Sequence, residues 1–82
     1  MAFLYILQSD TTNEFYIGAA ADLQKRLAEH LRGQSPYTRN RGPWKLVYQE
    51  EYATVAEARR REQQLKSWKS HRSIQNLIDG QG

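Results

Sequence analysis

Cysteine is absent from this sequence of 82 residues. Its absence excludes disulfide bonds and zinc sites built from thiolates, and it suits the reducing environment of a cytoplasm. No apolar run reaches the length of a membrane-spanning helix, and residues 1–8 lack the basic flank and long apolar core of a signal peptide. We therefore expect a cytoplasmic protein with no membrane partner, stabilised by its hydrophobic core alone.

Linkers, internal repeats and low-complexity segments are also missing. A chain this short holds one domain and one modest core. Hydrophobic residues make up 39% and charged residues 26%, values that are ordinary for a folded globular protein. We expect a single domain over residues 1–82, with its folded core at about 3–78.

Excess charge of one sign is small, because the net charge is only +3. This value favours an anionic partner only weakly. The basic residues are nevertheless clustered, at 59–61 and at Arg39, Arg41 and Lys45. For the run 59–61 taken alone, a solvated helix face is the simpler interpretation.

Hydrophobic patterning and turn residues predict six elements. Asp22 is expected to cap one helix, and Thr54 with Glu57 forms a capping box that begins another. The predicted elements are strands at 2–8, 15–18 and 44–52 and helices at 23–32, from Thr54 onward and at about 70–78, with Gly18 ending the second strand. This β-β-α-β-α-α order predicts an α+β fold, a three-stranded, mainly antiparallel sheet with helices packed on it. Trp44, Tyr48 and Trp68 are expected in the core.

Two polar positions stand out on the predicted helices. Arg26 and His30 lie one turn apart, beside the edge of a narrow leucine stripe, so we expect both at the border of the core. Glu62 shares a helix face with the apolar residues Ala58 and Leu65. An ionised carboxylate in such surroundings is costly unless it is paired or binds a cation.

Several catalytic arrangements have no counterpart in the sequence. There is no glycine-rich phosphate loop, and His30 and His71 lack the spacing of a zinc site. What remains is an ordered set of residues across most of the chain: Tyr5-Ile6, Tyr16-Ile17-Gly18, Arg26 ten residues after Tyr16, then His30 and Glu62.

This set resembles the GIY-YIG nuclease family, and in particular its small stand-alone bacterial members. The second tyrosine motif matches in full, whereas the first reads Leu4-Tyr5-Ile6, with leucine in place of the leading glycine. The segments 16–30, 37–39 and 58–68 are also similar to those members. Taken singly, each residue of the set has a structural interpretation, and only their common order favours a catalytic one.

The resemblance implies a catalytic role for Tyr5, Tyr16, Arg26, His30 and Glu62. Glu62 would hold a single Mg²⁺ or Mn²⁺, and Arg26 would bind the scissile phosphate. The tyrosines would orient or help to deprotonate the attacking water. On pKa grounds His30 is the easier base, and the sequence does not decide between tyrosine and histidine.

The implied activity is a metal-dependent DNA endonuclease of DNA repair or recombination. Gly18, Tyr37, Arg39 and Arg41 are the candidate nucleic-acid contacts, although Tyr37 could equally anchor its loop. Because the 82 residues hold no second domain, we expect branched, damaged or single-stranded DNA to be recognised by its shape or through a partner protein. The alternatives are a nucleic-acid-binding module with weak or no catalysis and an interaction protein that uses strand 44–52 as an edge.

Two departures from the family pattern follow the motifs. Excision-repair relatives carry lysine immediately after the second motif, where this chain has Ala19. Many relatives also have an asparagine downstream of the glutamate, and Asn76 is the candidate here.

Overall fold

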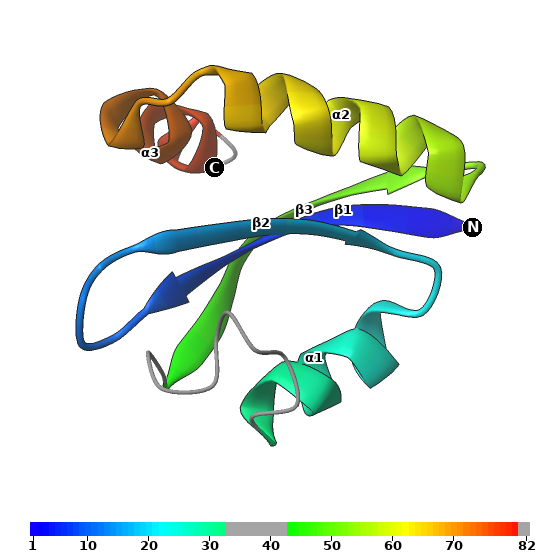
Figure 1. Cartoon of the computed structure of the whole chain (residues 1–82), viewed down its shortest axis with the longest axis horizontal. Coiled ribbons are helices and arrows are strands. Elements are labelled where there is room, and N and C mark those ends of the chain that lie inside the picture. Colours follow the sequence, from blue (N-terminus) through cyan, green and yellow to red (C-terminus); the bar gives the residue numbers. More distant parts are fainter. Residues whose placement is uncertain (33–42, 81–82) are drawn as a thin grey trace.

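The computed structural model describes residues 1–32 and 43–80, which form three strands and three helices in the predicted order. The elements are β1 (Ala2–Ser9), β2 (Phe15–Ala20), α1 (Leu23–Leu31), β3 (Trp44–Tyr52), α2 (Val55–Ser67) and α3 (His71–Asp79) (Figure 1). The α+β class is therefore confirmed.

The three strands form one antiparallel sheet with β1 at its centre and the order β2-β1-β3. Tyr5 pairs with Gly18 on one side, and Ile6 pairs with Tyr48 on the other. The β1–β3 register shifts between Ile6 and Leu7. The strand predicted to offer an edge, β3, is thus an edge strand of this sheet.

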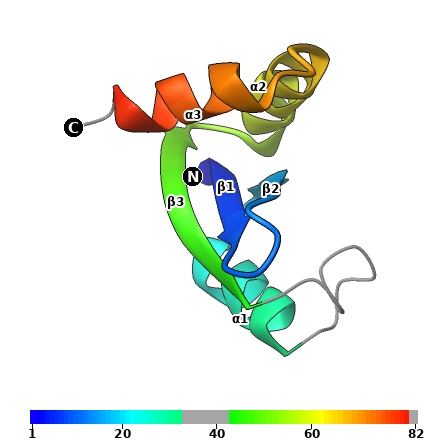
Figure 2. The ribbon, with the colours of Figure 1, turned by 90° about the vertical axis from the view of Figure 1, so that its left-hand side faces the viewer.

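The helices cover both faces of the sheet, with α1 on one side and α2 and α3 on the other (Figures 1 and 2). Because successive side chains of a strand point to opposite faces, β1 supplies two cores. Leu4 and Ile6 pack with Leu65 of α2 and Ile74 of α3. On the α1 face, the buried cluster consists of Tyr5, Leu7, Leu23 and Trp44.

The helix ends agree with the capping residues identified in the sequence. The Asp22 carboxylate accepts a hydrogen bond from the Lys25 amide at 3.0 Å, and the Thr54 hydroxyl accepts one from the Glu57 amide at 3.2 Å. These bonds satisfy amide groups that the first helical turn leaves unpaired. Within the described segments, no helix combines the length and apolar character needed to span a bilayer.

Two local predictions were wrong. β2 does not end at Gly18 but continues to Ala20, since Gly18 pairs with Tyr5 inside the sheet. Trp68 is 36% exposed and lies outside the core. It caps the C-terminal end of α2, with the Arg61 guanidinium 5.8 Å from its ring centroid. Trp44, in contrast, is buried as expected.

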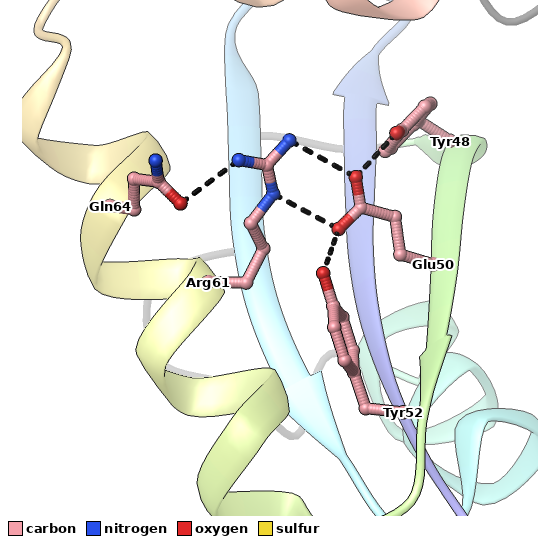
Figure 3. Close-up of polar contacts among 5 residues, drawn as sticks. All are labelled: Tyr48, Glu50, Tyr52, Arg61 and Gln64. Atoms are coloured by element: carbon pink, nitrogen blue, oxygen red, sulfur yellow. Dashed lines mark hydrogen bonds and ion pairs between the residues drawn. The ribbon is translucent and has the colours of Figure 1, made fainter.

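An ion pair ties α2 to the edge strand β3 (Figure 3). Arg61 donates from Nε and Nη2 to the two oxygens of Glu50, at 3.0 and 3.2 Å. The hydroxyls of Tyr48 and Tyr52 donate to the same carboxylate, which therefore has four donors. The run 59–61 is therefore not a uniformly solvated helix face, because Arg61 is held by Glu50 whereas Arg59 and Arg60 are exposed.

Candidate active site

The tyrosine of the first motif is the centre of a hydrogen-bonded group on the α1 face. The Tyr5 hydroxyl lies 3.0 Å from Nε2 of His30, and both residues are almost completely buried. Arg26, one turn before His30 on α1, hydrogen-bonds with Tyr5, Glu29 and Tyr16, and these bonds raise the pKa of its guanidinium. As Arg26 only donates, the phenol oxygen accepts from arginine and can donate its own proton to His30.

Gly18 makes room for this tyrosine. A β-carbon built on Gly18 would lie 2.5 Å from the Tyr5 hydroxyl oxygen and 2.6 Å from Cζ. Any side chain at position 18 would therefore displace the phenol from its place beside His30. The glycine of the second motif is buried in β2 and acts through packing against the residue with which it pairs.

The second tyrosine lies beside the same histidine but is more accessible. The Tyr16 ring centroid is 4.8 Å from that of His30 and 6.3 Å from that of Tyr5. Tyr16 is half-buried, whereas Tyr5 has 1% of its surface exposed. The two hydroxyls thus differ in their access to solvent, a distinction that is invisible in the sequence.

Burial sets the protonation states of the central pair. It raises the pKa of Tyr5 to about 12, with Arg26 opposing the shift and Tyr16 and Glu62 adding to it. For His30, burial and then the Arg26 charge lower the pKa below its ordinary value of 6.5. Near neutral pH, Tyr5 is therefore a neutral phenol and His30 a neutral imidazole that can accept a proton.

Glu62 approaches this group from the other side of the sheet. Its carboxylate is 16% exposed and binds the Lys66 ammonium at 2.5 Å, one turn further along α2. It is also close enough to raise the pKa of Tyr5. Arg26 does not take part in this ion pair, since its guanidinium pairs with Glu29 at 3.0 Å.

The donor set fits a hard divalent cation held by a single protein carboxylate. Across residues 1–32 and 43–80, no three His, Cys, Asp or Glu side chains gather as a metal-binding cluster. Mg²⁺ commonly keeps several waters and binds through one or two carboxylates together with substrate phosphate oxygens. Glu62, whose charge helps to raise the pKa of Tyr5, is the candidate for that carboxylate.

The sequence-based candidates thus fall into three sets. Tyr5, Tyr16, Arg26 and His30 come together on the α1 face, and Glu62 acts on Tyr5 from α2. Tyr37, Arg39 and Arg41 lie outside the described residues. Asn76 is exposed on α3 and lines a different cavity with Trp68, Ser73 and Leu77.

Two residues that hold side chains of the candidate site in place were not identified from the sequence. Glu29 holds the Arg26 guanidinium, and Lys66 holds the Glu62 carboxylate. Their signal was present as an i,i+3 and an i,i+4 pair of opposite charge, spacings that bring helical side chains together. Such pairs are frequent on helix surfaces, so nothing in the spacing alone distinguishes these two.

Comparisons with known proteins agree with this fold. The model of the GIY-YIG catalytic domain matches residues 1–75. A UPF0213 protein of Staphylococcus saprophyticus is 34% identical over 79 residues, 95% of each chain. A UPF0213 protein of Staphylococcus aureus is 38% identical over 73 residues, 88% of each. The solution NMR structure of a UPF0213 protein from Bacillus halodurans superposes with a TM-score of 0.63 at 32% identity, covering 100% of this chain and 87% of that one.

Proposed function

The chain belongs to the GIY-YIG catalytic domain family, and from this premise we propose that it is a metal-dependent DNA endonuclease of DNA repair or recombination. The observation that carries the proposal is the chain of hydrogen bonds from Arg26 through Tyr5 to His30. It joins a partly exposed cation that can bind phosphate to a buried hydroxyl and a buried neutral base. A binding module needs no such network.

Arg26 is the phosphate ligand in this mechanism. Its side chain is 37% exposed and is oriented by Glu29, so it can meet a substrate without leaving α1. Hydrogen bonds between a guanidinium and a phosphate are charge-assisted and stronger than those to a neutral phenol. A bound phosphate therefore draws Arg26 away from Tyr5 and leaves a lone pair of the phenol oxygen open to the attacking water.

The proton of that water then passes to His30 through Tyr5. The phenol oxygen takes a proton from the water while the Tyr5 hydroxyl proton moves to Nε2 of His30 over the 3.0 Å bond. The hydroxide attacks phosphorus, the bond to the 3′ oxygen breaks, and the leaving oxygen takes a proton from solvent water. The products carry a 5′-phosphate and a 3′-hydroxyl, and His30 returns its proton to solvent through Tyr5. This route needs no phenolate, which suits a tyrosine whose pKa burial raises to about 12.

A divalent ion held by Glu62 would supply the Lewis acid that stabilises charge on the leaving oxygen. The chain's own contribution is the position of that carboxylate. Leu65 fixes one face of α2 on the sheet, and Arg61 anchors the helix to Glu50 of β3. Glu62 thus stands on a helix held at two points.

The test is cleavage of duplex, branched and single-stranded DNA with Mg²⁺ or Mn²⁺, comparing wild type with Glu62→Gln. We expect the variant to lose metal-dependent cleavage, to keep DNA binding and to melt at nearly the wild-type temperature, because an ion pair whose lysine is 48% exposed contributes little to stability. Glu57→Gln on the same helix is the matched control, since glutamine also serves at that position of a capping box.

Arg26→Ala completes the experiment. It should cleave roughly 100-fold more slowly or worse, in the range for losing a donor to a developing charge, while binding falls much less. Unchanged cleavage per folded molecule in both Glu62→Gln and Arg26→Ala would overturn the nuclease proposal. Wild-type binding without cleavage of any substrate would favour the second candidate, a nucleic-acid-binding module.

A further inference from the structure

We infer that a cavity between the start of β2 and the α2–α3 turn binds one unpaired nucleotide of the strand being cut. The inference rests on the nuclease function proposed above and names a feature of its substrate. The cavity measures about 290 Å³. This is at the lower end of the range for small-molecule sites, so it suits a single nucleotide and not a duplex.

The cavity adjoins a second one that reaches Tyr16 of the candidate active site. A second cavity of about 260 Å³ is lined by Tyr16 together with Phe15, Ile17 and Lys66. The last three residues also line the first cavity. Figure 1 shows the α2–α3 turn above the beginning of β2. The lining residues of the first cavity come from these two segments and from α2 and α3 beside them. A strand whose scissile phosphate is held by Arg26 can therefore follow the edge strand β2 past Tyr16 and into the cavity.

The lining carries the charge that a phosphate needs. Lys66 and Lys69 both contribute to it, and Glu14 is the acidic residue among the side chains around them. Lys66 also binds Glu62, so it connects the cavity to the predicted metal ligand. Two ammonium groups in one groove beside a reaction centre favour a nucleic-acid backbone over a neutral ligand.

A pair of stacked rings supplies the surface for a base. The His71 ring lies on the Phe15 ring with centroids 4.4 Å apart and an interplanar angle of 24°. Phe15 packs against the core, whereas His71 is exposed at the start of α3. Unpaired bases stack on such rings with little regard to sequence. A base inside a duplex has no free face to offer, so the ligand is a single-stranded segment.

The backbone at Lys69 supports a functional role for that side chain. Its φ of 50° is in the left-handed region, which favours glycine or asparagine. Residues kept in such a conformation at a cost are concentrated at ligand-binding positions. Lysine at this position therefore serves through its side chain, by binding the ligand, and not through the conformation of the turn.

The test uses Lys69→Asn, because asparagine tolerates the left-handed backbone and removes the charge. Binding of a short single-stranded oligothymidylate is measured without metal across a range of salt concentrations. We expect the slope of log K against log salt to become shallower by about 0.7, the value for one lost contact to a single strand. The melting temperature should be equal or higher. Lys25→Gln, an exposed cation of α1 on the other face of the sheet, is the matched control and should leave the slope unchanged.

Amide chemical shifts locate the ligand independently of catalysis. On addition of the oligothymidylate, residues 66–71 of the wild type should shift. Shifts confined to α1, or an unchanged slope for Lys69→Asn, would overturn the inference, and cleavage by the wild type would leave the proposed function intact. If residues 66–71 shift and the slope changes while no DNA is cleaved with Mn²⁺, the proposed function fails and the nucleotide site stands.

Discussion

At the residue scale, one hydroxyl group connects most of the candidate site. The Tyr5 oxygen accepts from Arg26 and is hydrogen-bonded to His30, and it lies in the space left by Gly18. A buried polar atom with two partners is stabilising only while both remain, because leaving either unsatisfied carries a desolvation cost. The tyrosine therefore has a structural and a chemical role that can be separated by experiment.

Removing the hydroxyl groups of Tyr5 and Tyr16 one at a time separates the structural role from the chemical one. Tyr5→Phe leaves buried His30 without its donor, so we expect a loss of about 1–3 kcal/mol in stability together with a large loss of cleavage. Tyr16→Phe should be nearly as stable as wild type, since that residue is half-buried, and should cleave more slowly. Denaturant unfolding and single-turnover rates measure the two effects. Full activity in both variants would indicate that the tyrosines serve packing alone.

A methyl group at position 18 should also destabilise the protein, because it would displace the Tyr5 ring. Gly18→Ala would place a carbon 2.5 Å from the Tyr5 oxygen, and relieving that overlap costs about 1–3 kcal/mol. Gly80→Ala is the matched control, because its added carbon comes no nearer than 3.3 Å to the Asn76 carbonyl oxygen. Thermal melting of both variants tests the prediction, and equal melting temperatures would contradict it.

The histidine predicts how stability and rate change with pH. Its folded-state pKa is lowered below 6.5, so the folded protein resists a proton that the unfolded chain accepts. The His30 contribution is complete above that value and is lost as pH falls through the folded-state pKa. Melting temperature and cleavage rate should therefore both fall as the pH is lowered below about 6.5. In His30→Gln the melting temperature should depend less on pH over the same window, and an unchanged dependence would exclude this assignment.

At the element scale, α2 is placed by a contact that no local pattern predicts. Glu50 is on β3 and Arg61 on α2, eleven residues apart, and the two tyrosines that share the carboxylate alternate with it along the strand. Burial alone would raise the pKa of Glu50, but hydrogen bonds from Arg61, Tyr48 and Tyr52 lower it overall. The carboxylate thus stays charged and holds the helix (Figure 3).

Glu50→Gln tests this anchor. Glutamine cannot offer two charged oxygens to four donors, so we expect a loss of about 2–3 kcal/mol, typical of hydrogen bonds to a charged group. Glu51→Gln, at the neighbouring exposed position of β3, should be nearly neutral. Urea unfolding at neutral pH measures both. Stability of the wild type should also decline as acid protonates Glu50, a dependence that Glu50→Gln should reduce.

The elements themselves were predictable because their signals are local. Caps at Asp22 and Thr54 and the apolar periodicity gave the strands, the first and last helices and the start of α2 to within about two residues, with the largest difference at the end of β2. Gly18 was interpreted as a strand terminator. Nothing nearby in the sequence indicates that the Tyr5 ring fills the space that a side chain at position 18 would take. Trp68 was assigned to the core from its size, but the turn after α2 leaves it at the surface beside Arg61.

The site was predictable only in part, for the same physical reason. Order along the chain identified Tyr5, Tyr16, Arg26, His30 and Glu62. It gave neither the hydrogen bond between Tyr5 and His30 nor their burial, because both depend on packing between β1 and α1. It also did not indicate that Lys66 is the partner of Glu62.

At the scale of the whole molecule, the sheet separates two kinds of residue. The α1 face carries Tyr5, Tyr16, Arg26 and His30, whereas the opposite face holds the larger apolar core beneath α2 and α3. Changes beneath α2 and α3 should act mainly on stability, and changes around Arg26 mainly on the reaction. Glu62 is the exception, since it stands on α2 and acts on Tyr5.

The net charge of +3 predicts salt-sensitive DNA binding. If about three phosphates are neutralised, the slope of log K against log salt should be near −3 on duplex DNA. Equilibrium binding to a labelled duplex without metal, repeated at several salt concentrations, measures this slope. An affinity that does not vary with salt would be inconsistent with a phosphate-binding surface.

The central position of β1 has a consequence for synthesis on the ribosome. Ala2 pairs with Tyr52, so the first strand to be translated must wait about fifty residues for its second neighbour. At roughly 5–20 residues per second, this interval lasts several seconds. During it, β1 can pair with β2 but presents its other hydrogen-bonding edge to any nascent chain nearby. The period of greatest aggregation risk for this protein therefore precedes completion of β3, and slower translation of residues 21–52 should lengthen it.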